Sequence, residues 1–284
     1  MLTKFYLPNS LNVVSYLSPN FFWFYEAIGE YLSRTFNIPV QVKQSWADPF
    51  TDLLQQTELD IAFVCGLPLI RACHAAPDQL QAIAAPVMQS ERYQNRPIYF
   101  SDVVINTASS ITQFAQLAGK RFCFNDPGSN SGYNLMRHHL MQARYSTPFF
   151  REVMQSGSHQ QSIRWIIEQK ADCAAIDSVV LERELRQFQK GRPLAGISKR
   201  SPELSQLRVI QSLGSTPMPP IVASHRLEPV LELLQLALLR PDAKLRSQMQ
   251  QAGICRFAAV QTSDYEMIYQ IYDQTHHSEY AVIQ

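Results

Sequence analysis

The stretch RFCFNDPGSNSGY, residues 121–133, joins an apolar run to a polar turn and then to a segment with helical spacing. The apolar run at 122–124 is typical of a buried strand, and apolar residues recur every three or four positions across 135–141. A strand, a glycine-containing turn and a helix in this order are typical of α/β proteins. The stretch therefore predicts an α/β fold whose turn follows the end of a strand.

Strand-like and helix-like segments alternate along both halves of the 284-residue chain. In the first half, strands are expected at 11–16, 39–42 and 59–66, with helices at 21–36 and 49–56. In the second half, strands are expected at 97–105, 121–124, 149–154, 171–176 and 207–213, with helices at 133–143 and 162–170. The chain also exceeds the usual length of one domain, about 100 to 200 residues. Two α/β lobes with mainly parallel sheets are expected.

A proline-rich segment separates the second half from the C-terminal region. Residues 217–220 contain three prolines, which force an extended and stiff connection, so this segment is interpreted as a hinge. Helix-like runs beyond it, at 227–240 and 265–272, would cover the first sheet. The expected organisation is lobe one at 1–100, lobe two at 101–215 and a return to lobe one at 216–284.

The composition excludes several classes of protein. Lys and Arg total 25 against 24 for Asp and Glu, so the net charge of +1 provides no field for holding a nucleic acid. Hydrophobic residues make up 46% of the chain, yet no stretch approaches the roughly 18 uninterrupted apolar residues of a membrane-spanning helix. Neither nucleic-acid binding nor membrane insertion is expected.

The N-terminus and the cysteines bear on the compartment. No long apolar run follows Lys4, because polar residues and Pro8 interrupt it, so no signal segment is expected and a native start at Met1 would imply a cytoplasmic protein. The five cysteines form no CxxC pair, and Cys65, Cys123 and Cys173 lie in apolar runs. Buried free thiols are expected, which is compatible with a reducing compartment.

The turn at residues 129–132 is the main candidate site. A helix start exposes unpaired N–H groups and the positive end of the helix dipole, and Ser129, Asn130 and Ser131 add short donors. With Gly132, they form a cradle suited to an oxyanion. The alternative is that Ser129 or Ser131 is only a helix N-cap.

Two further side chains are expected at the same edge of the sheet. His159 follows one strand-like run and Asp177 ends the next, and loops after consecutive parallel strands meet at their carboxyl edge. His159 would then approach Ser131 and could donate to an anion. The alternatives are an exposed or capping histidine and an aspartate that caps a helix.

No pattern of catalytic or metal-binding residues is found. His138 with His139, and His276 with His277, are adjacent pairs whose side chains point about 100° apart on a helix, so neither pair alone forms a metal site. No GxSxG, HExxH or P-loop pattern occurs, and no base is placed beside Ser129 in the sequence. No cofactor, metal or enzymatic activity is therefore expected.

Several blocks together resemble a known family. They are LDIAF at 59–63 with Gly66 and Pro68, YFSDVV at 99–104, SNSGY at 129–133, SGSH at 156–159, ADCAAIDS at 171–178 and the prolines of 217–220. In this order they resemble the phosphonate, phosphite and phosphate substrate-binding proteins of ABC transporters, the PhnD-like branch of type II periplasmic binding proteins. The resemblance spans about residues 10 to 225. It implies two α/β lobes joined by a two-strand hinge with the ligand cleft between them.

The resemblance also implies roles for single residues. Ser129, Asn130 and Ser131 would hold the phosphonyl oxygens and His159 would add a contact, while Tyr99 near the hinge would face the cleft. From lobe one, an aromatic residue would cover the ligand, either Trp46, which we prefer, or Phe50.

The resemblance further implies that members which bind an aminoalkyl phosphonate surround its ammonium group with carboxylates. Here Gln160, Val179 and the prolines of 217–220 occupy the nearby positions, so Asp177 is the only acid left for this role. This departure argues against an aminophosphonate and leaves phosphate, phosphite or another substituted anion open.

The function implied is capture of a small oxyanion by hinge closure for ABC-type uptake, with a transporter permease as partner and a periplasmic or membrane-tethered location. Two alternatives on the same fold stay open. One is a signal-less cytoplasmic enzyme, such as those of menaquinone or thiamine-precursor synthesis. The other is a sensory domain that reports ligand binding to a protein partner.

Overall fold

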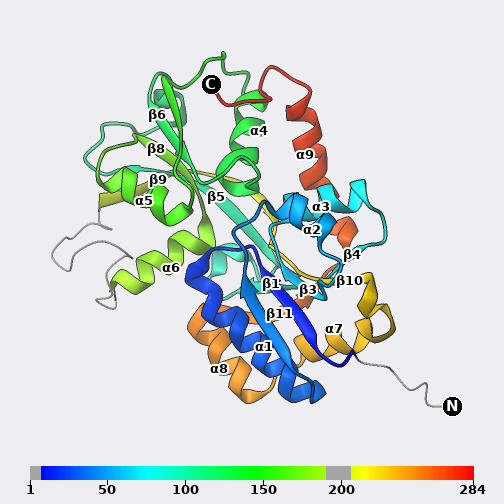
Figure 1. Cartoon of the computed structure of the whole chain (residues 1–284). Helices are drawn as coiled ribbons and strands as arrows, with labels where there is room; N and C mark the ends of the chain where they lie inside the picture. The colour runs from blue at the N-terminus through cyan, green and yellow to red at the C-terminus, as the bar shows by residue number, and fades with distance from the viewer. Residues whose placement is uncertain (1–7, 190–205) are drawn as a thin grey trace. The chain divides into compact units, whose positions relative to one another are not determined.

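The computed structural model describes residues 8–189 and 206–284, which divide into two compact units (Figure 1). The first unit comprises Met1–Ile98 and Pro217–Tyr269, and the second comprises Tyr99–Thr216 and Gln270–Gln284. Each unit has its own sheet covered by helices, so the predicted α/β class is correct. Within the described ranges, no helix combines the length and the hydropathy of a membrane span.

The first unit is built on a six-stranded sheet in the order β11-β4-β10-β3-β1-β2. Its strands are β1 (Leu11–Ser15), β2 (Val40–Gln44), β3 (Ile61–Phe63), β4 (Leu80–Met88), β10 (Ile221–Ser224) and β11 (Ile254–Ala259). Its helices are α1 (Phe22–Phe36), α2 (Pro49–Gln55), α3 (Gly66–Ala75), α7 (Leu231–Leu239), α8 (Ala243–Ala252) and the start of α9 (Glu266–His276). β1 runs parallel to β2 and β3, whereas β10 and β11 run antiparallel to their neighbours. The sheet is therefore mixed rather than parallel throughout.

Helix α1 packs tightly on the sheet and on the C-terminal helices of the first unit. A side chain at Gly29 would overlap Val42 of β2, so only glycine permits this approach. The hydroxyl of Tyr31 donates to the Ala237 carbonyl oxygen of α7 at 2.8 Å. This contact joins segments about 200 positions apart and closes the first unit, as the predicted C-terminal cover requires.

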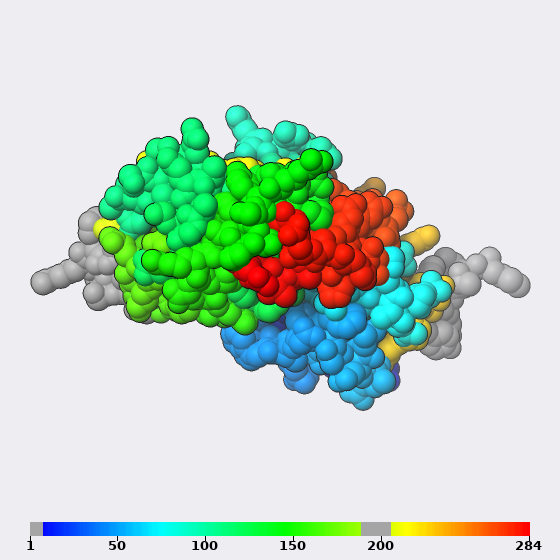
Figure 2. Space-filling model, turned by 90° about the horizontal axis from the view of Figure 1, so that it is seen from above, coloured from blue at the N-terminus to red at the C-terminus, as the bar shows by residue number. Residues whose placement is uncertain are grey.

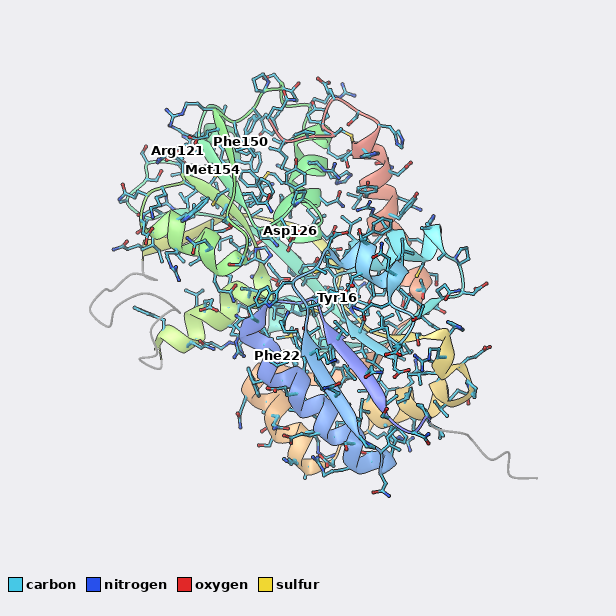
Figure 3. All side chains as sticks on the ribbon, in the orientation of Figure 1. Tyr16, Phe22, Arg121, Asp126, Phe150 and Met154 are labelled. Carbon is cyan, nitrogen blue, oxygen red and sulfur yellow. The ribbon has the colours of Figure 1, made fainter. Side chains whose placement is uncertain are left out.

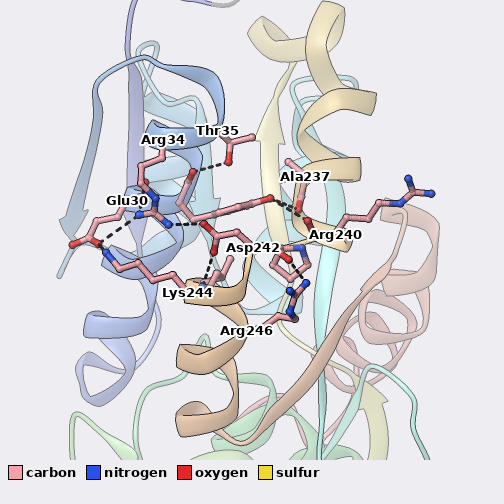
Figure 4. A network of polar contacts seen from close by, with 11 residues as sticks. Glu30, Arg34, Thr35, Ala237, Arg240, Asp242, Lys244 and Arg246 are labelled. Carbon is pink, nitrogen blue, oxygen red and sulfur yellow. Dashed lines mark hydrogen bonds and ion pairs between the residues drawn. The ribbon is translucent and has the colours of Figure 1, made fainter.

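An exposed ion-pair network joins α1 to the start of α8 (Figure 4). Arg34 pairs with Asp242 at 2.9 Å, and Lys244 pairs with Glu30 at 3.0 Å. Asp242 also caps α8 by accepting from the Leu245 N–H at 2.7 Å. Because solvent screens exposed pairs, each adds no more than about 1 kcal/mol.

The second unit is built on a five-stranded sheet in the order β7-β6-β8-β5-β9. Its strands are β5 (Ile98–Asn106), β6 (Arg121–Phe124), β7 (Glu152–Gln155), β8 (Cys173–Asp177) and β9 (Leu207–Pro217). Its helices are the π-turn η4 (Asn130–Asn134), α4 (Leu135–Gln142), α5 (His159–Ile167), α6 (Ser178–Gln189) and the rest of α9. β6 is parallel to β7 and β8, so the loops that follow these three strands share one edge.

Alternation along β6 shows why this sheet is covered on both faces. Phe122 and Phe124 lie in a cluster with Met136 of α4, whereas Cys123 packs with Ile163 of α5. Successive strand residues point to opposite faces, so a run without polar residues requires cover on each. The apolar run at 122–124 is thus an internal strand that is covered on both faces.

The C-terminal tail belongs to the second unit. Tyr280 and Ile283 are buried in the cluster that holds Phe122, and the Gln284 carbonyl oxygen accepts from the N–H groups of Phe149 and Phe150 at 2.7 and 3.0 Å. In Figure 2 the red C-terminal segment lies against the green surface of the second unit. The prediction assigned all of 216–284 to lobe one, whereas the contacts place Gln270–Gln284 in the second unit, because that unit's core takes up the tail's apolar side chains.

Several elements differ from the sequence-based expectation. Helix α3 begins at Gly66, where a turn was expected. Pro68 is tolerated in the first turn of this helix because an N–H at that position would have no acceptor within the helix. The elements β4, α6, α8 and β11 were not predicted at all.

The five cysteines are unpaired in the structure. Cys123 and Cys173 are buried as predicted, Cys65 and Cys73 are half-buried, and Cys255 is exposed.

Candidate ligand-binding site

The polar turn after β6 is shaped by Asp126. Its side chain accepts from the Gly128 N–H at 2.8 Å, and its carbonyl oxygen accepts from the Ser129 N–H at 3.2 Å. Figure 3 labels Arg121, at the start of strand β6, and Asp126, which lies beyond the end of that strand. These local bonds deliver the chain from the strand to the start of the next helix.

The helix after this turn starts earlier than predicted. The Asn134 N–H donates to the Ser129 carbonyl oxygen at 3.0 Å, and the Ser129 side chain accepts from the Gly132 N–H at 3.0 Å. Ser129 is therefore the N-cap, which was the alternative interpretation of this residue. The N–H groups of Asn130, Ser131 and Tyr133 precede the first helical acceptor, so they are the donors that the turn offers to an anion.

Residue 132 must be glycine because the Asn125 side chain lies against it. A side chain at this position would overlap the amide oxygen of Asn125, the residue that follows β6. That amide oxygen is buried and has no hydrogen-bond partner among the described residues. The glycine lets the turn fold back against the end of β6, so it has a packing role in the cradle.

His159 is the first residue of α5, and its Nε2 lies 3.2 Å from the Ser131 hydroxyl oxygen. The convergence predicted for the two loops at this edge is therefore present. Burial lowers the pKa of His159 to about 4, so the ring is neutral near pH 7. Its Nδ1 is buried without a partner in the part of the chain that the structure describes.

The Asn130 side chain is used entirely within the protein. Its Nδ2 donates to the Tyr99 hydroxyl oxygen and to the Thr216 hydroxyl oxygen, each at 3.1 Å. Its Oδ1 accepts from Asn134 Nδ2 at 3.1 Å, and the residue is 0% exposed. Only the backbone N–H of Asn130 remains for a ligand, so the expected side-chain donor is a buried structural group.

Asp177 lies near the turn but acts as a helix cap. In the ladder between β5 and β8 it pairs with Ser101, whose hydroxyl donates to the Ser131 carbonyl oxygen at 2.6 Å. The Asp177 carboxylate accepts from the Val179 N–H at 2.8 Å at the start of α6. Burial raises the pKa of this carboxyl to about 7, helped by the charge of Asp102 and opposed by the cap. One carboxylate oxygen of Asp177 therefore caps the helix, as the alternative interpretation expected.

The two aromatic candidates of the first unit differ in their surroundings. Trp46 follows β2 and its side chain is 80% exposed. The ring of Phe50 in α2 is covered by the Arg71 guanidinium, whose carbon lies 4.2 Å from the ring centroid. Trp46 therefore offers a free aromatic surface, whereas Phe50 is occupied.

Four residues of this site were not anticipated from the sequence. Thr216 directly precedes the proline-rich segment, and Ser101 lies within the strand predicted at 97–105. Asn134 lies one helical turn after Asn130, a spacing that could have indicated the amide pair, and Arg137 one turn further. The side chains that hydrogen-bond to residues 129–132 from elsewhere are uncharged near pH 7: Tyr99, Ser101, Asn134, His159 and Thr216.

No metal-binding cluster is seen in the described ranges, where no three His, Cys, Asp or Glu side chains gather suitably for an ion. The groups at the turn are backbone N–H groups of a helix start and the uncharged side chains named above. Donors of this kind can hydrogen-bond to an anion.

Solved structures share this fold across nearly the whole chain. PhnD1 from Prochlorococcus marinus, in complex with methylphosphonate, is 18% identical, with a TM-score of 0.79 over 96% of this chain and 100% of its own. A binding protein component of an ABC phosphonate transporter from Pseudomonas aeruginosa is 18% identical, with a TM-score of 0.73 over 92% of this chain and 85% of its own.

The periplasmic aliphatic sulphonate-binding protein SsuA from Escherichia coli is 16% identical, with a TM-score of 0.64 over 95% of this chain and 87% of its own. These likenesses show the type II periplasmic-binding-protein fold that the sequence predicted. No curated protein sequence matches the chain.

The family model described as "ABC transporter, phosphonate, periplasmic substrate-binding protein" matches residues 13–265. That range contains both sheets except for the first two residues of β1, and it includes the turn at 129–132 and His159. The chain therefore belongs to the periplasmic phosphonate substrate-binding protein family of ABC transporters.

Proposed function

We propose that this chain binds a small tetrahedral oxyanion, a phosphonate or a phosphate-like ion, on the turn at residues 129–132. The observation that carries this proposal is the set of donors at the helix start. The N–H groups of Asn130, Ser131 and Tyr133 have no helical acceptor there, and the Ser131 hydroxyl lies beside His159. The solved relative from P. marinus contains methylphosphonate, which is an ion of this shape.

The strength of such a site follows from its neutral donors. A hydrogen bond to a charged oxygen contributes about 1.5 to 3 kcal/mol, so four or five of them are sufficient for micromolar binding, about 8 kcal/mol. No cation is needed to reach this affinity. Reversible binding of this kind suits a protein that must release its ligand.

Calorimetric titration with phosphate, phosphite, methylphosphonate, 2-aminoethylphosphonate and methanesulphonate tests the ligand class. We expect tight binding of at least one phosphorus oxyanion and weaker binding of the sulphonate, which offers no P–OH or additional charge. If none of the phosphorus oxyanions binds, the proposed function is wrong. Preference for 2-aminoethylphosphonate would make the Asp177 oxygen that does not cap α6 the candidate acceptor for its ammonium group.

Ser131→Ala tests the site itself. The variant removes the hydroxyl beside His159 while leaving the Ser129 cap in place, so the fold should persist and affinity should fall about tenfold or more, the loss of one charge-assisted bond. Ser33→Ala is the matched control, because its hydroxyl bonds to the Ile38 carbonyl oxygen in the first unit. Equal affinities of the two variants would argue that the turn is only a helix cap.

Binding without chemistry is the proposed activity, although Ser131 and His159 lie within hydrogen-bonding distance, as a nucleophile and base do. A catalytic histidine is normally oriented through its second nitrogen, and His159 Nδ1 has no partner in the described part of the chain. Phosphorus NMR of bound ligand after denaturation is expected to recover it unchanged. A new phosphorus species would favour the enzyme alternative.

Delivery to an ABC permease in the periplasm is proposed from the family. Closure of the first unit over the bound ligand, with Trp46 covering it, stays a prediction. Small-angle scattering with and without the tightest ligand should show a smaller radius of gyration for the complex. Quenching of tryptophan fluorescence that is lost in Trp46→Ala would support the aromatic contact, and an unchanged signal in this variant would contradict it.

A further inference from the structure

A buried arginine lies at one end of a chain of side-chain amides that reaches the turn. Arg137 of α4 donates from one terminal nitrogen to the Ala281 carbonyl oxygen and from the other to Asn134 Oδ1, each at 2.8 Å. Its guanidinium carbon lies 5.3 Å from the Tyr133 ring centroid and 5.5 Å from that of Tyr272. The cation is therefore fixed within the second unit.

The chemistry of the guanidinium determines how both amides point. Arginine can only donate, so Asn134 must turn its oxygen to Arg137 and its nitrogen to Asn130. Asn130 must then accept with its oxygen and donate with its nitrogen. The direction of each bond in this relay is thus set by a group that cannot change its protonation state.

The relay ends on two hydroxyl groups that are forced to accept. Asn130 Nδ2 donates to Tyr99 and to Thr216, so neither hydroxyl can direct its own proton toward Asn130. Thr216 is 1% exposed, and among the described residues its hydroxyl proton has no acceptor. An unmade hydrogen bond of a buried donor is costly, so an acceptor is expected at this point.

We propose that Thr216 is a further ligand-binding residue, whose hydroxyl proton is directed to the bound oxyanion by the relay of Asn130, Asn134 and Arg137. This inference rests on the proposed function, since the acceptor is the anion held at the turn. An anionic oxygen is the strongest acceptor that a hydroxyl can meet. Arg137 thereby acts on the ligand without touching it, as a positioning residue.

The position of Thr216 in the chain fits this role. The hydroxyl groups of Thr216 and Tyr99 both accept from the Asn130 side chain, while the backbone N–H of Asn130 is one of the donors of the turn. Thr216 is also the last residue of the second unit before the chain passes to Pro217. The donor that completes the cradle thus comes from β9, about 86 positions away from the turn.

Thr216→Val tests the proposal against the tightest phosphorus oxyanion of the titration series. The variant keeps the size of the side chain but removes the hydroxyl, and we expect affinity to fall at least about tenfold, which is about 1.4 kcal/mol. Thr216→Ser keeps the hydroxyl and should bind within about threefold of the wild type. The control is Thr275→Val, a buried threonine whose hydroxyl bonds to helix carbonyl oxygens of α9, which should leave affinity unchanged.

Asn134→Asp provides a test that leaves Thr216 in place. The new carboxylate still accepts from Arg137 but cannot donate to Asn130, so the Asn130 amide turns over and the Thr216 hydroxyl donates to it instead of to the ligand. Affinity should fall as in Thr216→Val, and the double variant should bind no more weakly than Asn134→Asp alone. This non-additivity distinguishes a directed proton from a packing effect.

The outcomes separate this inference from the proposed function. Wild-type affinity in Thr216→Val, equal losses in the Ser and Val variants, or additive losses in the double variant would each overturn the role of Thr216 while leaving oxyanion binding intact. If Thr216→Val does not fold, unchanged affinity in Asn134→Asp overturns it. Failure of the wild-type protein to bind any phosphorus oxyanion refutes the proposed function itself.

Discussion

Acidification should destabilise the protein through His159, and the substitution His159→Gln isolates this effect. The glutamine amide can take the place of Nε2 beside Ser131 but does not titrate. Burial lowers the pKa of His159 to about 4 in the folded protein, against about 6.5 for an unperturbed histidine. The unfolded chain therefore binds a proton at mildly acidic pH that the folded chain excludes.

The sign and the magnitude follow from proton linkage. Between the two pKa values the unfolded state carries more protons, so stability rises with pH in this window and is lost as pH falls below about 6.5. With the folded pKa at about 4, the loss between about pH 7.5 and pH 4.5 is about 2.5 kcal/mol. Asp177 has the opposite effect on stability, because its folded pKa of about 7 lies above the ordinary carboxyl value. The pH dependence of the wild type alone would therefore understate the loss of stability caused by His159.

The assay is urea unfolding at several pH values, with the free energy of unfolding of His159→Gln subtracted from that of the wild type. This difference cancels Asp177 and every other shared group. Ser33→Ala, which removes a hydroxyl of the first unit and no titratable group, is the control, and its difference from the wild type should not change with pH. A difference that changes by less than about 0.5 kcal/mol across the range, or an NMR titration of His159 near pH 6.5, would refute the reasoning.

Two further substitutions test the geometry of the second unit. Gly132→Ala should destabilise the protein by about 1 to 3 kcal/mol and weaken oxyanion binding, because its methyl group overlaps the Asn125 amide; adding Asn125→Ala should restore much of both, and no rescue would refute the clash. Arg121→Met breaks the two bonds to the Asp172 carboxylate, 2.8 and 3.1 Å, and should cost about 1 to 2 kcal/mol in urea unfolding near pH 7. Arg121 holds the pKa of Asp172 below its usual value despite partial burial, so this cost should shrink as pH falls toward 3; a constant cost would contradict the ion pair.

The sequence was sufficient wherever neighbouring residues decide the structure. The apolar run of β6, the following turn and the helical spacing after it are local patterns, and the structure contains all three. The meeting of Ser131 and His159 was also predictable, because consecutive parallel strands bring their loops to one edge. Family membership followed from the order of such blocks.

The role of Asn130 was not predictable from local patterns. Its type and place suggest a ligand donor, yet its side chain bonds to Tyr99 and Thr216, which lie 31 and 86 positions away. The relay behind it ends at Ala281, 144 positions from Arg137. Only the packed second unit determines which donors are used up inside the protein and which remain for a ligand.

What the sequence alone determined is the strand, turn and helix start to which we assign oxyanion binding, because short-range spacing and capping chemistry specify these elements. What only the tertiary structure decided is the unit that takes up the tail, the mixed order of the first sheet and the direction of the buried amides. These depend on contacts between segments far apart in the chain. Such contacts form where burial and hydrogen bonding of the whole unit are best satisfied, and no local window of sequence contains that information.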